Sequence, residues 1–235
     1  MRIRSFIIAY ALVLAIVLFA DRRPNPAQQD RYSHIVDLTD GQSDGQSAPG
    51  QNPAADSRTR IIAPDSLIPG TWTASQIPPE RLIAPLVVMD LNVAPPAQIS
   101  LDDIAAWETQ HGAVPQGAVV AIRQPAGVPH PTSAWVGSAA APAPSAFPIT
   151  DQAAQFLMDA RYTTGFAIDE SSNLQSDRAL ARQIALHGNY VVEGASHLAA
   201  IPTTGSLIVV APARNAPPKD KKLQAAPVRV LAMVR

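Results

Sequence analysis

The sequence contains no cysteine, and this absence excludes several kinds of chemistry at once. Disulfide bonds, thiolate metal sites, iron–sulfur clusters and thiol nucleophiles all require cysteine side chains. Any metal ion would therefore have to be held by histidine, aspartate or glutamate.

The chain also lacks an excess of charge of either sign. Its 18 basic and 19 acidic residues give a formal net charge of −1, and charged residues make up 16% of the sequence. No single-sign field is available to attract a nucleic acid or an anionic membrane surface. We therefore expect no nucleic-acid partner.

Common catalytic signatures are missing as well. The sequence has no Gly-x-Ser-x-Gly, His-Glu-x-x-His, P-loop or Gly-x-Gly-x-x-Gly motif. These motifs are typical of hydrolases, zinc proteases and nucleotide-binding proteins, so the sequence gives no support to those classes.

The first 20 residues are typical of an export signal. Arg2 and Arg4 precede an apolar run at 6–20, which has the length of a signal-peptide core. At about 1.5 Å per residue this run covers about 22 Å, which is short for a hydrocarbon layer of about 30 Å. We expect an exported periplasmic or extracellular protein, with 1–20 as a cleaved signal peptide or a short membrane anchor and 21–31 as a polar linker. Membrane contact is expected only through this segment if it stays uncleaved.

Residues 32–235 alternate between apolar runs and helical patterns, which favours a single α/β domain. Ser100 and Asp103 form a capping-box pattern at the start of a helix that Gly112 ends. Two segments at 41–66 and 125–148, rich in proline and in small or polar residues, are expected to be long loops. Strands are predicted at 34–38, 86–91, 117–123, 166–169, 190–192, 207–210 and 228–234, and helices at 100–112, 150–160 and 176–186.

Histidines and carboxylates are the candidates for metal ligands. His187, Glu193 and His197 form the most suggestive local set, because two imidazoles and a carboxylate can bind zinc. The spacing is only weak support, since His187 falls near a predicted helix end, where histidine commonly binds the last carbonyls. A structural role for His187 and a packing role for His197 therefore stay open.

A longer pattern connects the chain with a known family. The runs IPGTWTASQIPPERL at 68–82 and APLVVMD at 84–90 are followed, in the same order, by matches at 107–108, 111–112, 147–148, 168–169, 190–193, 207–212 and 227–232. The pattern, which starts at Val36, resembles the cyclase family that includes the kynurenine formamidases. The resemblance implies a swivelling β/β/α domain with a mixed sheet and flanking helices, usually oligomeric. Active members of that family use zinc or manganese to hydrolyse N-formylkynurenine or a related amide or lactone.

The hallmark of that family is largely lost here. It reads His-Thr-Gly-Thr-His-x-Asp-Ala-Pro-x-His, with the first two histidines and the aspartate on the metal and the last histidine in catalysis; a later histidine and glutamate complete the site. Aligned without gaps, the hallmark falls on residues 56–66. The implied ligand and catalytic positions are occupied by Asp56, Arg60, Ile62, Ser66, Ala181 and Glu193, and Glu193 alone keeps the family's residue.

Arg60 is the most damaging of these changes for a metal site. A single positive charge about 4 Å from a divalent ion costs on the order of 8 kcal/mol at an effective dielectric of about 20. We therefore expect that metal-dependent hydrolysis is lost and that no cofactor is bound, with zinc or manganese expected only if hydrolysis is retained. Arg60 is predicted to pair instead with Glu193 or Asp56.

Three functions follow from these expectations. The first is an exported cyclase-like protein that binds a small molecule or a partner chain, with Trp72 as a further pocket candidate. The second is a metal-dependent amide or lactone hydrolase of the arylformamidase type, active in tryptophan catabolism, whose site is rebuilt from Asp56, Asp65 and Glu193 with His187 or His197. The third is a structural subunit, either in a homo-oligomer or beside a paralogous cyclase chain.

Overall fold

The computed structural model describes residues 32–40, 59–91, 98–124, 146–169, 172, 174, 177–212 and 225–235. Several predictions lie outside these ranges: the export segment at 1–20, the linker at 21–31, Asp56 and most of the expected loop at 125–148. No helix within the described ranges is long and apolar enough to cross a bilayer.

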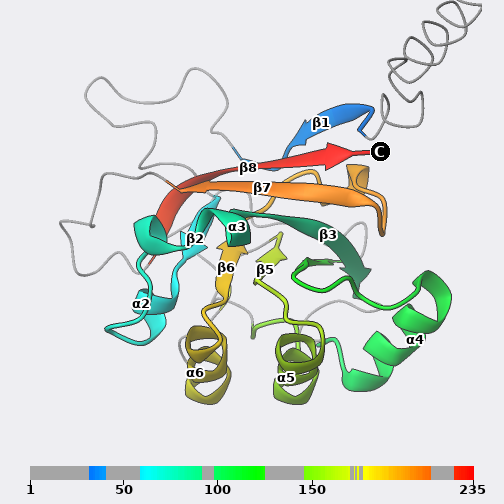
Figure 1. Ribbon diagram of the computed structural model, residues 1–235. Helices are drawn as coiled ribbons and strands as arrows, with labels where there is room; N and C mark the ends of the chain where they lie inside the picture. Colours follow the sequence, from blue (N-terminus) through cyan, green and yellow to red (C-terminus); the bar gives the residue numbers. More distant parts are fainter. Residues whose placement is uncertain are drawn as a thin grey trace, which may run out of the picture.

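The described strands form one mixed sheet that closes on itself (Figure 1). The strand order is β1-β8-β2-β6-β5-β4-β3-β7, and a further pairing of β8 with β7 closes β2 to β8 into a barrel-like sheet of seven strands, to which β1 adds at β8. The strands are β1 (His34–Asp37), β2 (Arg60–Ile62), β3 (Ile83–Asp90), β4 (Val119–Arg123), β5 (Gly165–Ile168), β6 (Tyr190–Glu193), β7 (Ser206–Pro212) and β8 (Ala226–Val234).

Helices flank this sheet, as the α/β prediction requires. The α-helices are α2 (Pro64–Leu67), α3 (Pro79–Leu82), α4 (Leu101–His111), α5 (Asp151–Ala160) and α6 (Arg178–Leu186), and the 3-10 segments are η3 (Ala74–Gln76) and η5 (Leu198–Ala200). The mixed sheet with flanking helices confirms the predicted fold class.

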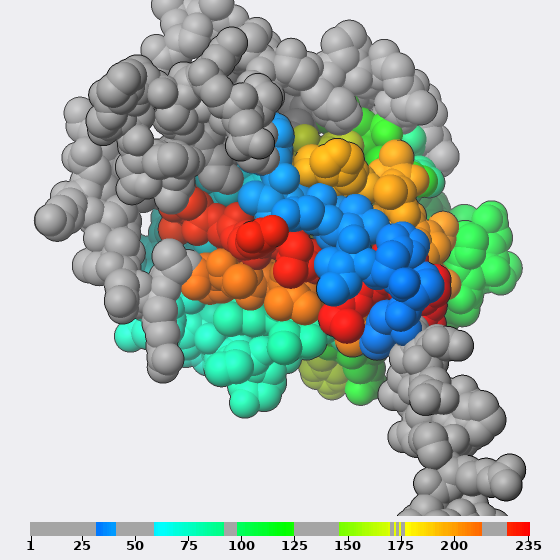
Figure 2. Space-filling model, turned by 90° about the horizontal axis from the view of Figure 1, so that it is seen from above, coloured from blue at the N-terminus to red at the C-terminus, as the bar shows by residue number. Residues whose placement is uncertain are grey.

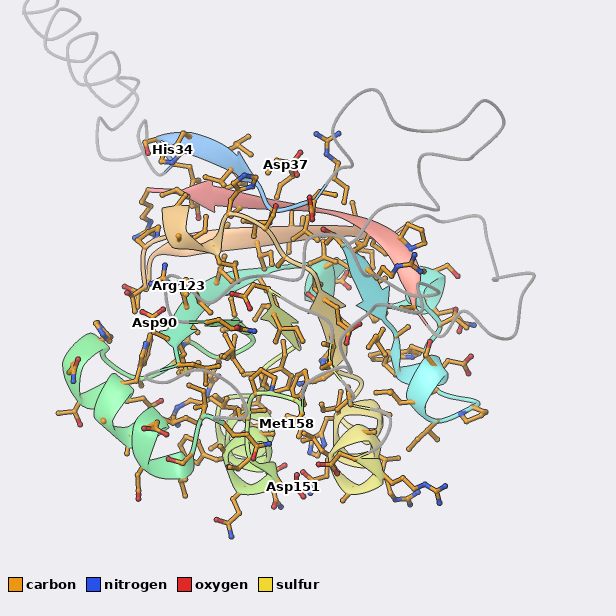
Figure 3. All side chains as sticks on the ribbon, turned by 180° about the vertical axis from the view of Figure 1, so that it is seen from behind. His34, Asp37, Asp90, Arg123, Asp151 and Met158 are labelled. Atoms are coloured by element: carbon orange, nitrogen blue, oxygen red, sulfur yellow. The ribbon has the colours of Figure 1, made fainter. Side chains whose placement is uncertain are left out.

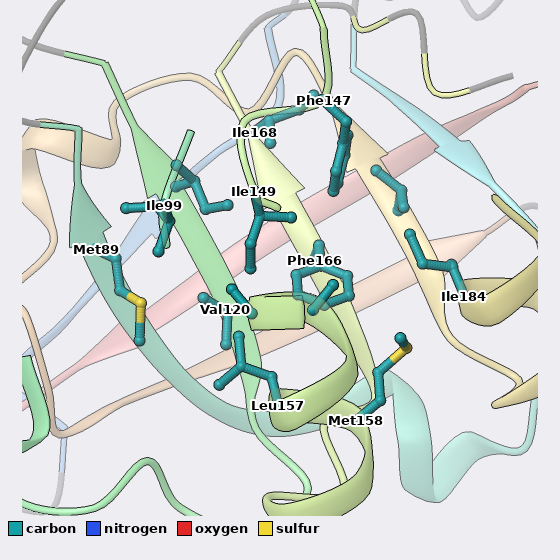
Figure 4. Close-up of a cluster of buried hydrophobic side chains, with 14 of the residues drawn as sticks. Met89, Ile99, Val120, Phe147, Ile149, Leu157, Met158, Phe166, Ile168 and Ile184 are labelled. Atoms are coloured by element: carbon teal, nitrogen blue, oxygen red, sulfur yellow. The ribbon is translucent and has the colours of Figure 1, made fainter. Parts of the chain in front are cut away.

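The parallel part of the sheet consists of β3, β4, β5 and β6. Its strands are buried on both faces, so alternate residues enter two separate cores. Val120 packs into the core between sheet and helices, which Figure 4 shows in close-up, whereas Val119 packs into the core inside the closed sheet. Glu193 at the end of β6 lies two residues after Val191, and it therefore points to the helix-covered face.

The helices α4 and α5 begin after the predicted capping residues Ser100 and Thr150, whereas α6 begins at Arg178, two residues later than predicted. Ser100 Oγ accepts a hydrogen bond from Asp103 N (3.2 Å), and Asp103 Oδ2 accepts one from Ser100 N (2.8 Å), which confirms the capping box of α4. Gly112 ends this helix with a φ of 85°, a value that favours glycine.

The prediction of a loop over residues 41–66 was wrong for the last part of this range. Residues 60–62 form β2, which pairs with both β6 and β8, and α2 begins at Pro64. A strand of three residues is too short to show a period of two. Its pairing with two distant strands therefore stabilises a segment that carries no local strand signal.

The N-terminal strand β1 lies at the edge of the sheet, hydrogen-bonded to β8. Figure 2 shows β1 in blue beside β8 in red, with β7 in orange next to them. Pairing runs from His34 opposite Val234 to Asp37 opposite Leu231, and Arg229 donates to Asp37 Oδ2 (3.0 Å). The strands β1, β7 and β8 lie on the side of the molecule opposite the helices α5 and α6 (Figure 1).

Candidate functional site

Polar side chains gather where the parallel strands end. β3 ends at Asp90, β4 at Arg123 and β6 at Glu193, and Asp169 follows β5 directly. Arg123 holds the Asp90 carboxylate with both Nε and Nη2, and Figure 3 shows the two residues side by side. The carboxyl ends of parallel strands share one edge, and this edge is the usual ligand site of such sheets.

Glu193 is the most buried acid among the described residues, with 8% of its surface exposed. Its Oε1 accepts hydrogen bonds from Ser172 N (2.9 Å) and Ser172 Oγ (2.8 Å). Burial raises the pKa of the Glu193 carboxyl above its ordinary value of 4.5, while the Ser172 hydrogen bonds and the charge of Arg60 oppose that rise. The carboxyl is thus held in place but is costly to ionise.

Arg60 lies directly across from Glu193. The antiparallel register of β2 and β6 pairs these two residues, which brings their Cα atoms to about 4.5–5.5 Å and both side chains to the same face. Arg60 is partly buried, and its positive charge opposes the rise in the pKa of Glu193 that burial causes. The register thus makes Arg60 and Glu193 neighbours, while the predicted pairing of their side chains stays a prediction.

Two of the implied ligand positions are part of the apolar core. Ile62 is 3% exposed on β2 and Ala181 is 6% exposed on α6, and both belong to the cluster that includes Leu180 and Ile184. Neither side chain has an atom that can bind a metal ion. The face beside Glu193 is therefore filled with hydrocarbon at these two positions.

Ser66 and Asp65 lie on α2, the short helix after β2. Ser66 is partly buried, and its backbone N donates to Ala63 O (3.0 Å). Asp65 Oδ1 accepts a hydrogen bond from Gly70 N (2.8 Å) and so closes the turn that follows the helix. Asp65 has a structural role here, and no contact of either side chain with Glu193 is observed.

Trp72, a pocket candidate, lies at the other end of β6. Its indole packs against Gly188, where an added Cβ would come within 2.8 Å of Cζ3. Gly188 precedes β6, whereas Glu193 ends it, and five residues of strand span about 16 Å. The structure therefore separates Trp72 from the carboxyl edge, because the long segment 63–82 runs from β2 back to the start of β3.

The histidine candidates are separated in the same way. His187 ends α6, where Nδ1 lies 2.8 Å from Gln183 O and Nε2 lies 2.8 Å from Asp159 Oδ1. His197 Nδ1 instead lies 3.1 Å from Asp37 O, beyond the far end of β6. The two imidazoles lie near opposite ends of β6, so His187, Glu193 and His197 do not come together as one metal site.

The sequence of the chain was compared with models of known protein families. The Cyclase family model matches residues 52–173, which is more than half of the chain and includes β2, α2 and the parallel strands β3 to β5. The chain belongs to the cyclase family. The resemblance seen in the sequence is thereby confirmed.

Solved structures support the cyclase fold over most of the chain. Isatin hydrolase A from Labrenzia aggregata, bound to benzyl benzoate, is 22% identical, with a TM-score of 0.64 over 86% of this chain and 93% of that one. Isatin hydrolase A from Ralstonia solanacearum is 20% identical, with a TM-score of 0.62 over 96% and 97%. A potential metal-dependent hydrolase with cyclase activity is 23% identical, with a TM-score of 0.59 over 86% and 98%. The comparison with curated proteins gave no match.

The residues described here do not fit the metal ion of the cyclase hydrolases. Divalent zinc needs three or four donor atoms at about 2 Å. Among the implied positions within the described ranges, Glu193 alone carries a suitable donor, and those ranges contain no group of three histidines, aspartates or glutamates placed to share an ion. Arg60 adds a positive charge directly across from that donor.

Ser172 was not anticipated as a site residue. It donates twice to Glu193 from the segment between β5 and α6, where the sequence shows no strand or helix pattern. Gln124 was missed too; it is 7% exposed after β4, and its backbone N donates to Asp169 Oδ2 (2.9 Å). Only the arrangement of the strands brings these polar groups to the edge, so no local signal could have identified them.

The raised pKa of Glu193 predicts how stability depends on pH. The folded state binds the Glu193 proton more tightly than the unfolded state does. Stability from protonated Glu193 is therefore fully present below the ordinary pKa of 4.5 and is lost as pH rises through the raised pKa. We expect Glu193→Gln, which stays neutral and keeps an acceptor for Ser172, to raise the free energy of unfolding at pH 8 relative to the unchanged protein.

Urea unfolding at pH 5 and pH 8 measures this effect. The unchanged protein should lose more stability between the two pH values than Glu193→Gln does. Asp90→Asn provides a matched control, because Asp90 is exposed at the same edge and lies in a surface pair with Arg123. A pH dependence that is identical in Glu193→Gln and the unchanged protein would contradict the prediction.

Proposed function

We propose that this cyclase-family chain does not hydrolyse its ligand through a bound metal ion but binds a small polar molecule at the carboxyl edge of its sheet. One observation carries the proposal. Ile62 and Ala181 are packed into the core at positions where the resemblance implies an aspartate ligand and a histidine that completes the site. Rebuilding a metal site would require replacing buried hydrocarbon with charged or polar groups, which destabilises a packed core.

The remaining polar groups suit the binding of a ligand with both donors and acceptors. The Arg60 guanidinium can donate hydrogen bonds, and the Glu193 carboxyl can accept or, when protonated, donate them. Ser172 donates both of its hydrogen bonds to Oε1 of Glu193, so the ligand in this proposal would bind at Oε2. Glu193, which is buried and held by Ser172, loses little conformational freedom on binding.

A second candidate is the metal-dependent amide or lactone hydrolase. It is favoured by the retained Glu193 and by the solved relatives, which are described as isatin hydrolases and as a potential metal-dependent hydrolase. Its predicted site includes Asp56, which lies outside the described residues. Self-association, or association with a paralogous cyclase chain, and export of the protein remain predictions that accompany either candidate.

Metal content and turnover measured on the same sample separate the two candidates. The full-length protein is equilibrated with zinc or manganese, desalted and analysed for bound metal, and hydrolysis of isatin and of N-formylkynurenine is then followed with and without a chelator. We expect far less than one ion per chain and no turnover that the chelator abolishes. Stoichiometric metal together with chelator-sensitive turnover would establish the hydrolase instead.

Glu193→Gln is the matched variant for this experiment. Any turnover that persists unchanged in Glu193→Gln does not depend on the retained carboxylate and counts as background. A loss of metal and of turnover in this variant would assign both to Glu193 and would contradict the proposal.

A further inference from the structure

Arg81 is a partly buried cation for which the described part of the chain offers no acidic partner. The partly buried Arg123 and Arg161 each hold a carboxylate, from Asp90 and Glu108 respectively. Arg81 on α3 contacts only neutral oxygens: Nη2 donates to Asn189 Oδ1 (2.8 Å) and to His187 O (3.3 Å). Burial lowers the pKa of Arg81, in accordance with a guanidinium that lacks a counter-charge.

Buried groups hold Arg81 in one position. Asn189 is fully buried, and its Nδ2 donates to Thr163 Oγ1 (3.3 Å), which orients the amide oxygen toward Arg81. Tyr190, also fully buried, donates from its hydroxyl to Arg81 O (3.0 Å) and fixes the backbone of α3. The guanidinium is therefore pre-positioned before any ligand arrives.

The donor of Arg81 that remains unburied and without a hydrogen bond in the described part of the chain is Nη1. Nε is buried without a partner, and Nη2 is occupied by Asn189 and His187. Nη1 makes no hydrogen bond in the described part of the chain and is not among its buried, unpartnered atoms. Nη1 therefore keeps some contact with solvent, which an incoming anion requires.

Trp72 provides an apolar surface beside this donor. The Arg81 guanidinium carbon lies 5.7 Å from the centre of the Trp72 ring, and 39% of Trp72 remains exposed. The indole rests against Gly188, so it is held between the end of α6 and α3. An exposed tryptophan beside a fixed arginine is typical of binding surfaces.

A purely structural role for Arg81, as a cation at the C-terminus of α6, accounts for its Nη2 contacts alone. It explains neither the absence of a carboxylate partner nor the exposed ring of Trp72. Asp159, the acid that His187 contacts through Nε2 (2.8 Å), makes no ion pair with Arg81 in the described part of the chain.

We propose that Arg81 and Trp72 form a binding site for the carboxylate of a small apolar acid. The carboxylate accepts a hydrogen bond from Arg81 Nη1, and the apolar part of the acid lies against the exposed indole of Trp72. This site lies at the amino end of β6, whereas Glu193 lies at its carboxyl end, so it is separate from the function proposed above.

Binding of phenylacetate tests this proposal directly. The indole N–H signal of Trp72 is followed by NMR in the full-length protein at constant ionic strength and is assigned with Trp72→Phe. Phenylacetate should shift this signal saturably. Phenylacetamide lacks the charge and acetate lacks the ring, so each should bind at least about tenfold more weakly than phenylacetate.

Two arginine variants complete the test. Arg81→Gln should weaken phenylacetate binding by about tenfold, whereas Arg229→Gln, which removes an exposed arginine paired with Asp37, should leave it unchanged. If Arg81→Gln does not fold, the comparison of phenylacetate with phenylacetamide on the unchanged protein decides. Equal binding of these two compounds, no saturable shift at Trp72, or full binding by a folded Arg81→Gln would overturn the proposal.

Discussion

Replacing Gly165 by alanine is expected to lower the free energy of unfolding by about 3 kcal/mol or more. Gly165 begins β5, a central strand paired with β4 and β6. An added Cβ would lie 2.8 Å from Tyr190 O and 2.8 Å from Tyr190 Cε2. The carbonyl belongs to the neighbouring strand and cannot move alone, and the ring is fixed by its hydroxyl bond to Arg81 O (3.0 Å).

Gly70→Ala is the matched control for this substitution. Gly70 has a φ of 91° and nothing within 4 Å of an added Cβ, so alanine there costs only backbone strain, about 1 kcal/mol. Urea unfolding of both variants measures the difference. Equal losses would mean that the close approach of Gly165 and Tyr190 does not limit the size of the residue at that position.

Replacing Ile62 by aspartate is the second change with a large expected effect, a loss of about 3–5 kcal/mol. Ile62 is 3% exposed in the core cluster of the helix-covered face. Aspartate there would either leave an uncompensated charge or remain protonated with unmet hydrogen bonds. Arg60, two residues earlier on the same face, is already opposite Glu193.

The effect of added zinc on the melting temperature of Ile62→Asp distinguishes the two proposed functions. If the carboxyl edge still formed a metal site, an aspartate at the implied ligand position would be stabilised by the ion, and added zinc would raise the melting temperature. We expect no recovery by zinc. Ile62→Val is the control, since it keeps the position apolar and should cost about 1 kcal/mol. A zinc-stabilised Ile62→Asp would contradict the view that this position has become core.

Much of the fold was predictable because its signals are local. The capping box of Ser100 and Asp103 and the apolar run at 117–123 depend on neighbours in sequence. The capping box appears as predicted, and the apolar run forms β4 from Val119 onward. β2 was missed because its three residues gain their stability from β6 and β8, which are far away in the chain.

The candidate site was predictable only in part. The family pattern led to the prediction that Arg60 pairs with Glu193 or Asp56, and the strand register brings Arg60 opposite Glu193. The pattern could not identify Ser172, whose two hydrogen bonds to Glu193 come from an irregular segment. It also grouped Trp72 with a pocket that lies at the other end of β6.

The residue types in the sequence were sufficient to exclude thiol chemistry and to identify the cyclase resemblance, and through that resemblance they predict that most ligand side chains are replaced. Spatial relations required the folded chain. Strand order and register decide that Arg60 meets Glu193, that Ile62 and Ala181 are buried in hydrocarbon, and that Arg81 and Trp72 form a separate surface at the amino end of β6. These pairings depend on contacts between segments far apart in the chain, and no local pattern encodes them.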